Sequence, residues 1–132
     1  MDISAVVKND AATHEVSVRT DGIARTLLIP PKATGRGSAV NGGELLMLAL
    51  ATCYCNDFYR EAEHLGIALD AVEVEATASF PAVALAATNI RYRATISSSA
   101  SPSAIADLLR HTDAVAEVRN TIRAGVPVEL VT

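Results

Sequence analysis

Hydrophobic and β-branched residues are concentrated in three short runs at the start of the chain. These runs are Ile3–Lys8, His14–Arg19 and Ile23–Ile29. Asn9-Asp10 and Asp21-Gly22 separate them, and both pairs favour tight turns. We therefore expect a meander of three antiparallel strands. A loop should follow over residues 30–38, where prolines and glycines interrupt any regular pattern.

The next hydrophobic stretch has the start and end signals of a long helix. Asn41 is a good N-cap, and the Glu44 carboxylate three residues later can accept a hydrogen bond from the N–H of the cap. Every position from Leu45 to Ala51 is apolar, so the helix is hydrophobic around its whole circumference there. Such a helix needs cover on all sides, from a sheet or from a partner chain. We place its end at Gly66, which favours a left-handed C-cap.

Two runs with strict alternation follow and predict a β-hairpin. Their apolar positions are Val72, Val74, Ala76, Ile90, Tyr92, Ala94 and Ile96. Acidic residues lie between these positions on the first strand, and arginines lie between them on the second. The opposite face of the hairpin is therefore expected to carry cross-strand ion pairs.

The last part of the chain predicts two helices and a strand. Ser101-Pro102 starts the first helix, because proline is favoured at the first helical position, and we expect it to run to about His111. Thr112 or Asp113 is expected to cap a further helix over Ala114–Arg123, which ends at a glycine. A strand over residues 126–131 completes the order βββ-α-ββ-αα-β. Strands and helices occur in blocks, which favours an α+β fold, in one domain over residues 1–132.

Composition narrows the classes of function. Hydrophobic residues make up 50% of the chain and aromatic residues 4%, and the net charge is −4. An acidic chain with scattered basic residues and few aromatic rings argues against nucleic-acid and membrane partners. The longest apolar run is far shorter than the roughly 20 residues of a membrane span. The start Met1-Asp2-Ile3-Ser4 lacks the pattern of a signal peptide, so we expect a cytoplasmic protein.

Two motifs resemble the signature of the OsmC/Ohr family. Asn41-Gly42-Gly43-Glu44-Leu45-Leu46, followed by Ala51-Thr52-Cys53, is similar to the family's Asn-Pro-Glu-Glu-Leu-Leu…Ala-Ala-Cys. The run from Asn120 to Val128 resembles the end of its second motif, Cys-Pro-Val-Ser-Asn-Thr-Leu…Gly-Val-Pro-Val. The expected element order also resembles the family fold over essentially the whole chain. The resemblance implies an OsmC-like fold, with antiparallel sheets around a long central helix, in an intertwined homodimer.

The resemblance also implies a chemistry. Family members reduce organic hydroperoxides in oxidative stress defence: one thiolate attacks the peroxide, and a second cysteine resolves the sulfenic acid. Cys53 stands at the position of the reactive cysteine, whereas Ala116 and Glu117 replace the second cysteine and its proline. Gly43 replaces a glutamate that holds an arginine over the thiolate in the family. The candidates for that arginine are Arg19 and Arg25. The chain therefore resembles a divergent branch that lacks the second cysteine.

Cys53 is the residue on which this function depends. A free cysteine has a pKa near 8.5, so a peroxidatic thiol needs a nearby cation or helix N-terminus. Asp57 and Arg60 lie on the same helical face, where the carboxylate disfavours the thiolate and the guanidinium favours it. Arg60 can also simply pair with Asp57. The alternative is that Cys53 is an inert core residue, because cysteine is often buried.

Cys55 is the second candidate, as a replacement for the missing resolving cysteine. Side chains two residues apart on a helix diverge by about 200°, so a disulfide between Cys53 and Cys55 requires local unwinding. An external thiol such as glutathione can resolve the sulfenic acid instead, and Cys55 then serves in packing. A metal site of both cysteines with His64 or His111 is disfavoured by the same geometry, and we expect no cofactor. Arg36, in the glycine-flanked loop before the helix, is either a plain solvated arginine, which is the favoured interpretation, or a residue that meets an anionic group.

Two hypotheses follow for the function. The first is a thiol-dependent organic hydroperoxide reductase that acts on a small hydrophobic peroxide through Cys53, with Cys55 or an external thiol as the resolving group. The second is a non-enzymatic OsmC-fold homodimer that binds a small apolar ligand or has a structural role. They differ in whether Cys53 is accessible and whether a cation lies beside it.

Overall fold

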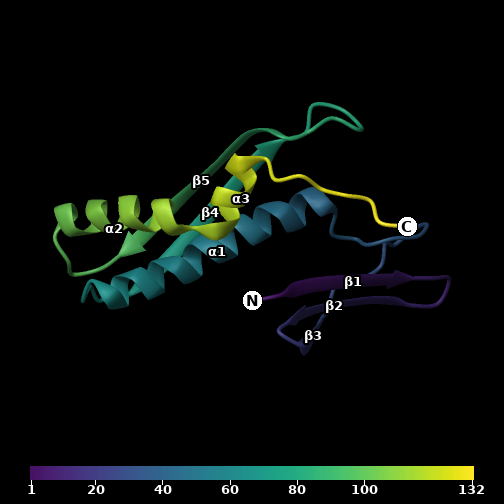
Figure 1. Cartoon of the computed structure of the whole chain (residues 1–132), viewed down its shortest axis with the longest axis horizontal. Coiled ribbons are helices and arrows are strands. Elements are labelled where there is room, and N and C mark those ends of the chain that lie inside the picture. Colours follow the sequence, from purple (N-terminus) through teal and green to yellow (C-terminus); the bar gives the residue numbers. More distant parts are fainter. The chain divides into compact units, whose positions relative to one another are not determined.

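The structure is a computed structural model that describes residues 1–132 (Figure 1). Its elements are β1 (Ile3–Asn9), β2 (His14–Thr20), β3 (Ile23–Leu27), α1 (Gly42–His64), β4 (Ala71–Ser79), β5 (Thr88–Ser97), α2 (Pro102–Val115) and α3 (Glu117–Ala124). The chain forms two compact units, Met1–Glu44 and Leu45–Thr132, so the boundary falls in the first turn of α1. The predicted order of elements is confirmed as far as α3.

The first unit contains the predicted antiparallel meander. β2 lies between β1 and β3, with Val6 opposite Ser17 and Val18 opposite Arg25. The turn between β2 and β3 has positive φ angles at both Asp21 (46°) and Gly22 (85°). This is the conformation of the tight hairpin turns that such residue pairs favour, because their twist matches that of the strands.

α1 begins and ends with the predicted signals. The backbone N–H of Asn41 donates to Glu44 Oε2 at 2.8 Å, and the Glu44 N–H donates to Asn41 Oδ1 at 2.9 Å. These two bonds form the expected capping box, which satisfies backbone donors that the first helical turn leaves unpaired. After the helix, Gly66 has a φ of 67°, the left-handed conformation that lets the chain leave α1 at low cost.

In the second unit, β4 and β5 form the predicted hairpin. Along both strands, half-buried and exposed side chains alternate without interruption through the predicted apolar positions. On the exposed face, Glu75 lies opposite Arg93, and the Arg93 Nη2 donates to Glu75 Oε2 at 2.7 Å. One of the expected cross-strand ion pairs is therefore present.

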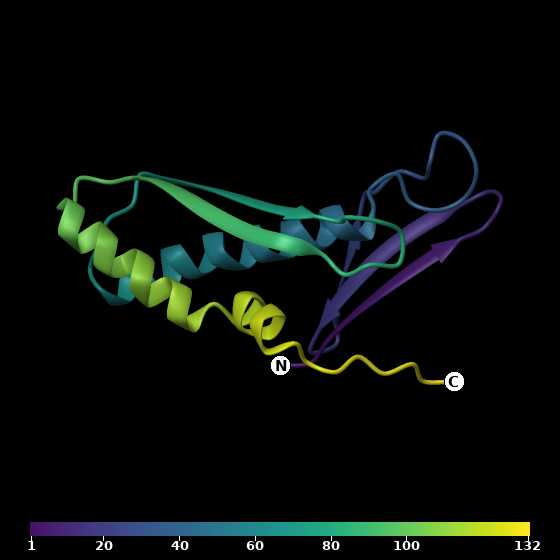
Figure 2. The ribbon, with the colours of Figure 1, turned by 90° about the horizontal axis from the view of Figure 1, so that it is seen from above.

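The core of the second unit forms where α1 and α2 pack against the apolar face of this hairpin (Figures 1 and 2). Its fully packed members are Tyr54, Phe58, Ala62, Leu108 and Ala116. The Tyr54 ring contacts the rings of Phe58 and Tyr92 edge-on, with both pairs of ring centroids 4.7 Å apart. Aromatic contacts of this kind stabilise a core beyond the area they bury. The contact between Tyr54 and Tyr92 joins α1 to β5, and it does so at the residue that directly follows Cys53.

The predicted junction between α2 and α3 is wrong by about four residues. α2 continues past His111 to Val115, and the extended backbone of Ala116 separates it from α3. Thr112 does not cap a helix, because it lies one turn after Leu108 and both side chains are fully buried. The Ser101 cap is confirmed, since its hydroxyl accepts from the Ala104 N–H, and Gly125 ends α3 as predicted.

The predicted last strand is also wrong. Residues 125–132 have no regular secondary structure, and the Val128 side chain is 98% exposed. Alternating apolar residues make a strand only when a neighbouring strand completes its hydrogen bonds. No strand of the chain pairs with this segment, so its apolar pattern is not realised as a strand.

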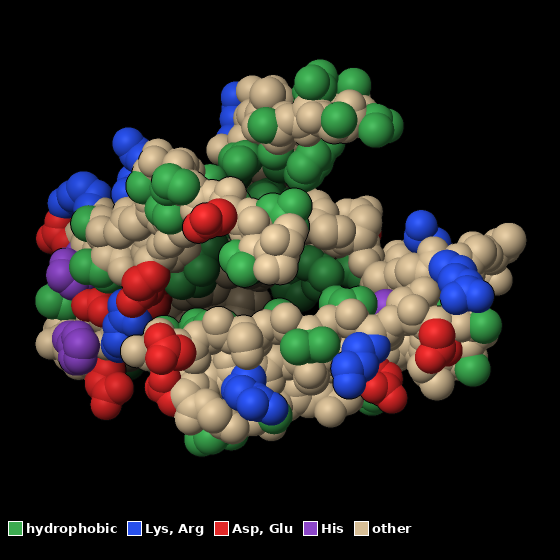
Figure 3. Space-filling model, turned by 45° about the vertical axis from the view of Figure 1, so that its right-hand side comes forward, with side chains coloured by type: hydrophobic (Ala, Val, Ile, Leu, Met, Phe, Trp, Pro, Cys, Tyr) green, Lys and Arg blue, Asp and Glu red, His purple; other side chains and the backbone are tan.

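Part of the hydrophobic surface of the second unit is left uncovered by that unit. Hydrophobic side chains lie on the surface among polar ones (Figure 3). On α1, Leu46 and Leu48 are exposed, the latter to 60%. The predicted need for cover around this apolar turn is therefore not met within the second unit. None of the three helices combines the length and hydrophobicity of a membrane-spanning segment.

Candidate functional site

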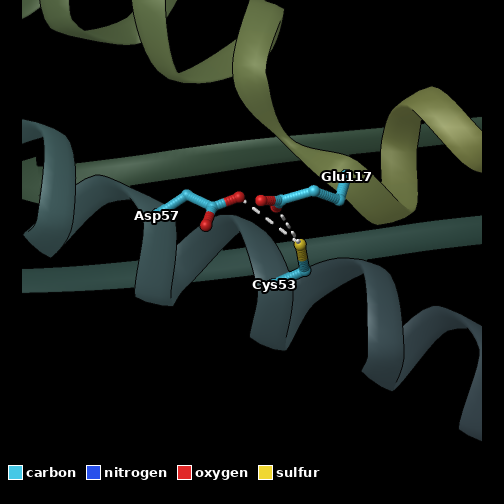
Figure 4. Close-up of side chains that lie close together, drawn as sticks. All are labelled: Cys53, Asp57 and Glu117. Atoms are coloured by element: carbon cyan, nitrogen blue, oxygen red, sulfur yellow. Dashed lines mark hydrogen bonds between the residues drawn. The ribbon is translucent and has the colours of Figure 1, made fainter. Parts of the chain in front are cut away.

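Cys53 lies in the middle of α1, is half-buried, and faces the start of α3 (Figure 4). Its Sγ donates to Asp57 Oδ2 at 3.4 Å, and Glu117 Oε2 lies 3.7 Å from the same sulfur. The backbone N–H of Val118, in the first turn of α3, also hydrogen-bonds the sulfur. The thiol is therefore held between two carboxylates and one backbone donor.

The two carboxylates come to the thiol in different ways, Asp57 through its spacing on the same helix and Glu117 through tertiary packing. Asp57 follows Cys53 by four residues on a helix, and this spacing puts both side chains on one face. Glu117 is 64 residues away in the sequence and is the first residue of α3. Ala116 just before it is buried in the core, which holds the start of α3 against α1. The site therefore depends on where α2 ends.

The environment raises the pKa of the Cys53 thiol. Burial is the main cause, and the neighbouring carboxylates of Asp57 and Glu117 act in the same direction. The hydrogen bond from the Val118 N–H opposes them by favouring the thiolate, but it does not outweigh burial. Cys53 is thus a protonated thiol at neutral pH, in contrast to a preformed peroxidatic thiolate.

The pKa of Asp57 is raised as well. Its side chain is almost completely buried, and burial is the largest cause; the charge of Glu117 adds to it. The hydrogen bond from Cys53 and the guanidinium of Arg60 oppose the shift. A carboxylate with a raised pKa is a stronger proton acceptor, so the thiol donates to a base of increased strength.

The Arg60 guanidinium contacts neighbouring carboxylates rather than the Cys53 thiol. Its Nη1 lies 2.7 Å from Asp57 Oδ1 and 3.8 Å from Glu117 Oε1, and its Nε donates to Glu61 Oε1 at 2.7 Å. The sequence left open whether the carboxylate or the guanidinium is closer to Cys53. The structure shows that the Asp57 carboxylate is closer to Cys53, and that Arg60 pairs with Asp57 and Glu61.

The two histidines that were candidate metal ligands belong to another cluster. His111 Nε2 lies 2.8 Å from Glu61 Oε2, and His64 Nδ1 lies 3.5 Å from the same oxygen. The pKa of Glu61 falls to about 2, chiefly because Arg60 and then His111 hydrogen-bond its carboxylate. Both histidines therefore contact the Glu61 carboxylate rather than the cysteines.

The metal-ligating atoms that do converge are one sulfur and two carboxylates. Cys53 Sγ and oxygens of Asp57 and Glu117 all lie within 4.8 Å of one another. Thiolate and carboxylate are both zinc ligands, so this set has suitable chemistry for such an ion. It differs from the cysteine–histidine set that was considered from the sequence and disfavoured by helical geometry.

Cys55 has a free thiol and is half-buried. α1 is continuous through both cysteines, so the local unwinding that a disulfide between them requires is not present. The other sequence candidates belong to the first unit: Arg19 lies on β2, Arg25 on β3, and Arg36 in the exposed loop before α1. Sequence reasoning missed Glu117, although the second motif pointed to its position as the neighbour of the lost resolving cysteine.

A cavity of about 430 Å³ lies beside α3. Its lining comes from α1, β5, α2 and α3 and consists of Leu50, Ile90, Tyr92, Asp113, Arg119, Ile122 and Arg123. Leu50, the α1 residue that lines the cavity, is one helical turn before Cys53.

Comparisons with known proteins agree on one family. A family model described as OsmC-like protein matches residues 35–131. No curated protein matches the chain. Among solved structures, an OsmC-like protein from Mycoplasma pneumoniae is 21% identical, covering 92% of this chain and 86% of that chain, with a TM-score of 0.66. An organic hydroperoxide resistance protein OsmC from Legionella pneumophila is 23% identical, covering 96% and 94%, with a TM-score of 0.60. At 14% identity, an OsmC-like protein of unknown function from Vibrio cholerae covers 92% and 93%, with a TM-score of 0.58.

Proposed function

The chain belongs to the OsmC-like protein family, and we propose that it is a thiol-dependent organic hydroperoxide reductase in which Cys53 reacts and Asp57 accepts its proton. The observation that carries this proposal is the hydrogen bond from Cys53 Sγ to the buried Asp57 carboxylate at 3.4 Å. A base within hydrogen-bond reach of the nucleophile allows attack from a protonated thiol, without a preformed thiolate.

The proposed reaction begins with proton transfer from the Cys53 thiol to Asp57. The sulfur then attacks the terminal oxygen of the hydroperoxide, the one that carries hydrogen, so that a new S–O bond forms and the O–O bond breaks. Asp57 returns the proton to the departing alkoxide, which leaves as an alcohol. Overall, one thiol and one hydroperoxide give a sulfenic acid and an alcohol, so atoms and charge balance. The raised pKa of Asp57 suits both halves of this proton transfer.

Regeneration of Cys53 requires a thiol from outside the site. Ala116 occupies the position where the family has its resolving cysteine, and Cys55 lies on a continuous helix. We propose that a small thiol such as glutathione attacks the sulfenic acid, which releases water and leaves a mixed disulfide. A second thiol molecule then releases Cys53 and leaves as the oxidised disulfide.

The decisive experiment exchanges the proton acceptor without changing its shape. Asp57→Asn removes a negative charge beside the thiol, so it lowers the thiol pKa and should speed alkylation of Cys53 by iodoacetamide. If Asp57 is the base, the same substitution slows reduction of cumene hydroperoxide by about 100-fold. Cys53→Ser should abolish turnover. Both assays are run in a Cys55→Ala background so that only one thiol reports.

Asp107→Asn is the matched control, because Asp107 is an exposed acid on α2 that pairs with Arg110 away from the thiol. It should leave alkylation and turnover unchanged. If Asp57→Asn accelerates both alkylation and peroxide reduction, Asp57 only suppresses the thiol and is not its base. If Cys53→Ser retains full activity, the whole proposal is wrong.

A second candidate function is a non-enzymatic homodimer that binds a small ligand. The exposed apolar turn of α1 around Leu48 and the cavity beside α3 favour it. We propose the homodimer in either case, with a second copy covering this turn, and light scattering after gel filtration measures the mass. Leu48→Glu should shift the mass to that of one chain, whereas Glu63→Gln, at an exposed position of the same helix, should not. Binding without any peroxide turnover would favour this second candidate.

A further inference from the structure

We infer that the cavity beside α3 binds a small carboxylate with an apolar body, and that Arg123 pairs with its negative group. The cavity is open to solvent and has a volume of about 430 Å³, within the range of sites for small organic molecules. This inference does not depend on the reaction of Cys53, which is not among the residues that line the cavity.

Three of the residues that line the cavity are apolar. Leu50 on α1 is almost completely buried, and Ile90 on β5 and Ile122 on α3 are half-buried. These side chains come from three different elements, α1, β5 and α3, so the packing of the second unit holds them together. Burial of a hydrocarbon or an aromatic ring against these apolar side chains stabilises the bound state.

The other lining residues are polar or charged, and their charges are unequal. Asp113 accepts hydrogen bonds from the Tyr92 hydroxyl and from Arg119 Nη2, the latter at 2.7 Å. Arg119 also donates to Asn120 Oδ1 at 2.9 Å. Asp113 and Arg119 therefore neutralise each other, and both Asp113 oxygens already accept hydrogen bonds.

Arg123 supplies the excess charge of the lining. Its guanidinium forms no ion pair and no side-chain hydrogen bond in the structure, although the chain as a whole carries a net charge of −4. With Asp113 and Arg119 paired, the cavity has one uncompensated positive charge. A guanidinium with free donors suits a carboxylate, which it can hold through two parallel hydrogen bonds. A neutral molecule of the same shape lacks this interaction.

Calorimetric titration of the full-length protein with octanoate and with octanamide tests the inference. Octanoate should bind, and octanamide, which has the same chain but no charge, should bind at least tenfold more weakly. Arg123→Gln should reduce octanoate affinity at least tenfold and leave octanamide affinity unchanged. Arg110→Gln is the matched control, because Arg110 is an exposed arginine on α2 outside the cavity. It should bind octanoate as the unaltered protein does.

Three outcomes would overturn the inference. Equal affinity for octanoate and octanamide would show that charge plays no part, and an unchanged affinity in Arg123→Gln would exclude that residue. If octanoate fails to bind and Arg123→Gln weakens association between chains, a second copy fills the cavity. Cys53→Ser separates this test from the proposed reaction, because the variant should keep full octanoate affinity even where peroxide reduction is lost. Circular dichroism on each variant checks that it is folded.

Discussion

Asp57 and Glu61 lie one turn apart on α1 and are equally buried, at 3% and 6% exposure. Their neighbours differ. Asp57 faces the Cys53 thiol and the Glu117 carboxylate, whereas Glu61 accepts hydrogen bonds from Arg60 and His111. The pKa of Asp57 is accordingly raised, and the pKa of Glu61 falls to about 2.

This difference shows that the neighbouring charges decide the properties of a buried carboxylate on this helix. Burial raises the pKa of a carboxyl group unless cations and hydrogen bonds to its charged form outweigh burial. Arg60 touches both acids, but its Nε hydrogen bond strengthens the charged form of Glu61, and His111 adds to it. One helix thus holds a proton acceptor at one turn and a structural ion pair at the next.

Removing the packing that holds both acids should have the largest effect. Phe58 lies between Asp57 and Glu61 in the sequence, and its side chain is completely buried. Phe58→Ala should therefore lower the free energy of unfolding by about 3–5 kcal/mol. Urea unfolding measures the loss. Tyr59→Ala, at an exposed position of the same helix, is the control and should cost well under half as much. Equal losses in the two variants would mean that α1 is not anchored through Phe58.

Glu61→Gln should destabilise the protein in a pH-dependent manner. The folded pKa of about 2 lies below the ordinary value of 4.5, so ionised Glu61 stabilises the fold fully above pH 4.5. This contribution is lost as the pH falls from about 4.5 to about 2. The Tm of the variant should lie below that of the unaltered protein at pH 7, and the gap should close over that window. A gap that stays constant with pH would show that shape, not charge, is what Glu61 provides.

Arg60→Ala removes the cation that the two acids share. Because Arg60 lowers the pKa of both Asp57 and Glu61, both values should rise, which NMR titration of carboxyl carbons can follow. The charge of Asp57 beside Cys53 also loses its compensation, so alkylation of Cys53 at pH 8 should slow a few-fold. Arg60→Lys should recover part of the rate. Faster alkylation in Arg60→Ala would contradict this electrostatic account.

The smallest effect is expected for an exposed ion pair with the same short distance. The Arg93–Glu75 and Arg60–Glu61 pairs both have a nitrogen–oxygen distance of 2.7 Å. The side chains of Arg93 and Glu75 are 76% and 56% exposed, whereas that of Glu61 is only 8% exposed. A double-mutant cycle on Arg93 and Glu75 should give a coupling of about 0.2–1 kcal/mol, and 1 M salt should remove most of it. A larger, salt-insensitive coupling would indicate that burial is not the main difference between the two pairs.

Features that depend on nearby residues were predictable from the sequence. The Asn41–Glu44 capping box and the Gly66 C-cap involve residues within one turn of each helix end, so their residue types were sufficient. The alternation along β4 and β5 predicted the buried face of the hairpin for the same reason. The family resemblance seen in the two motifs is likewise confirmed, by the match over residues 35–131.

Features that depend on distant partners were not predictable in this way. The apolar residues near Val128 have the pattern of a strand, but a strand needs a neighbour, and the chain supplies none. Thr112 has the residue type of a helix cap, yet it lies one turn after Leu108 on the buried face of α2. Glu117 was read only as the substitute for a lost proline, because nothing near it in the sequence indicates that it meets Cys53.

By itself, the sequence determined the order of elements up to α3, the ends of α1, the buried face of the hairpin, and the position of Cys53 on a long apolar helix. Helix caps and alternating faces are set by residues a few positions apart, which is why these features could be predicted. Only the tertiary structure decided that the thiol faces two carboxylates while Arg60 pairs with the acids. That arrangement joins the middle of α1 to the first residue of α3, and it exists because α2 continues to Val115 and buried Ala116 brings Glu117 against the sulfur.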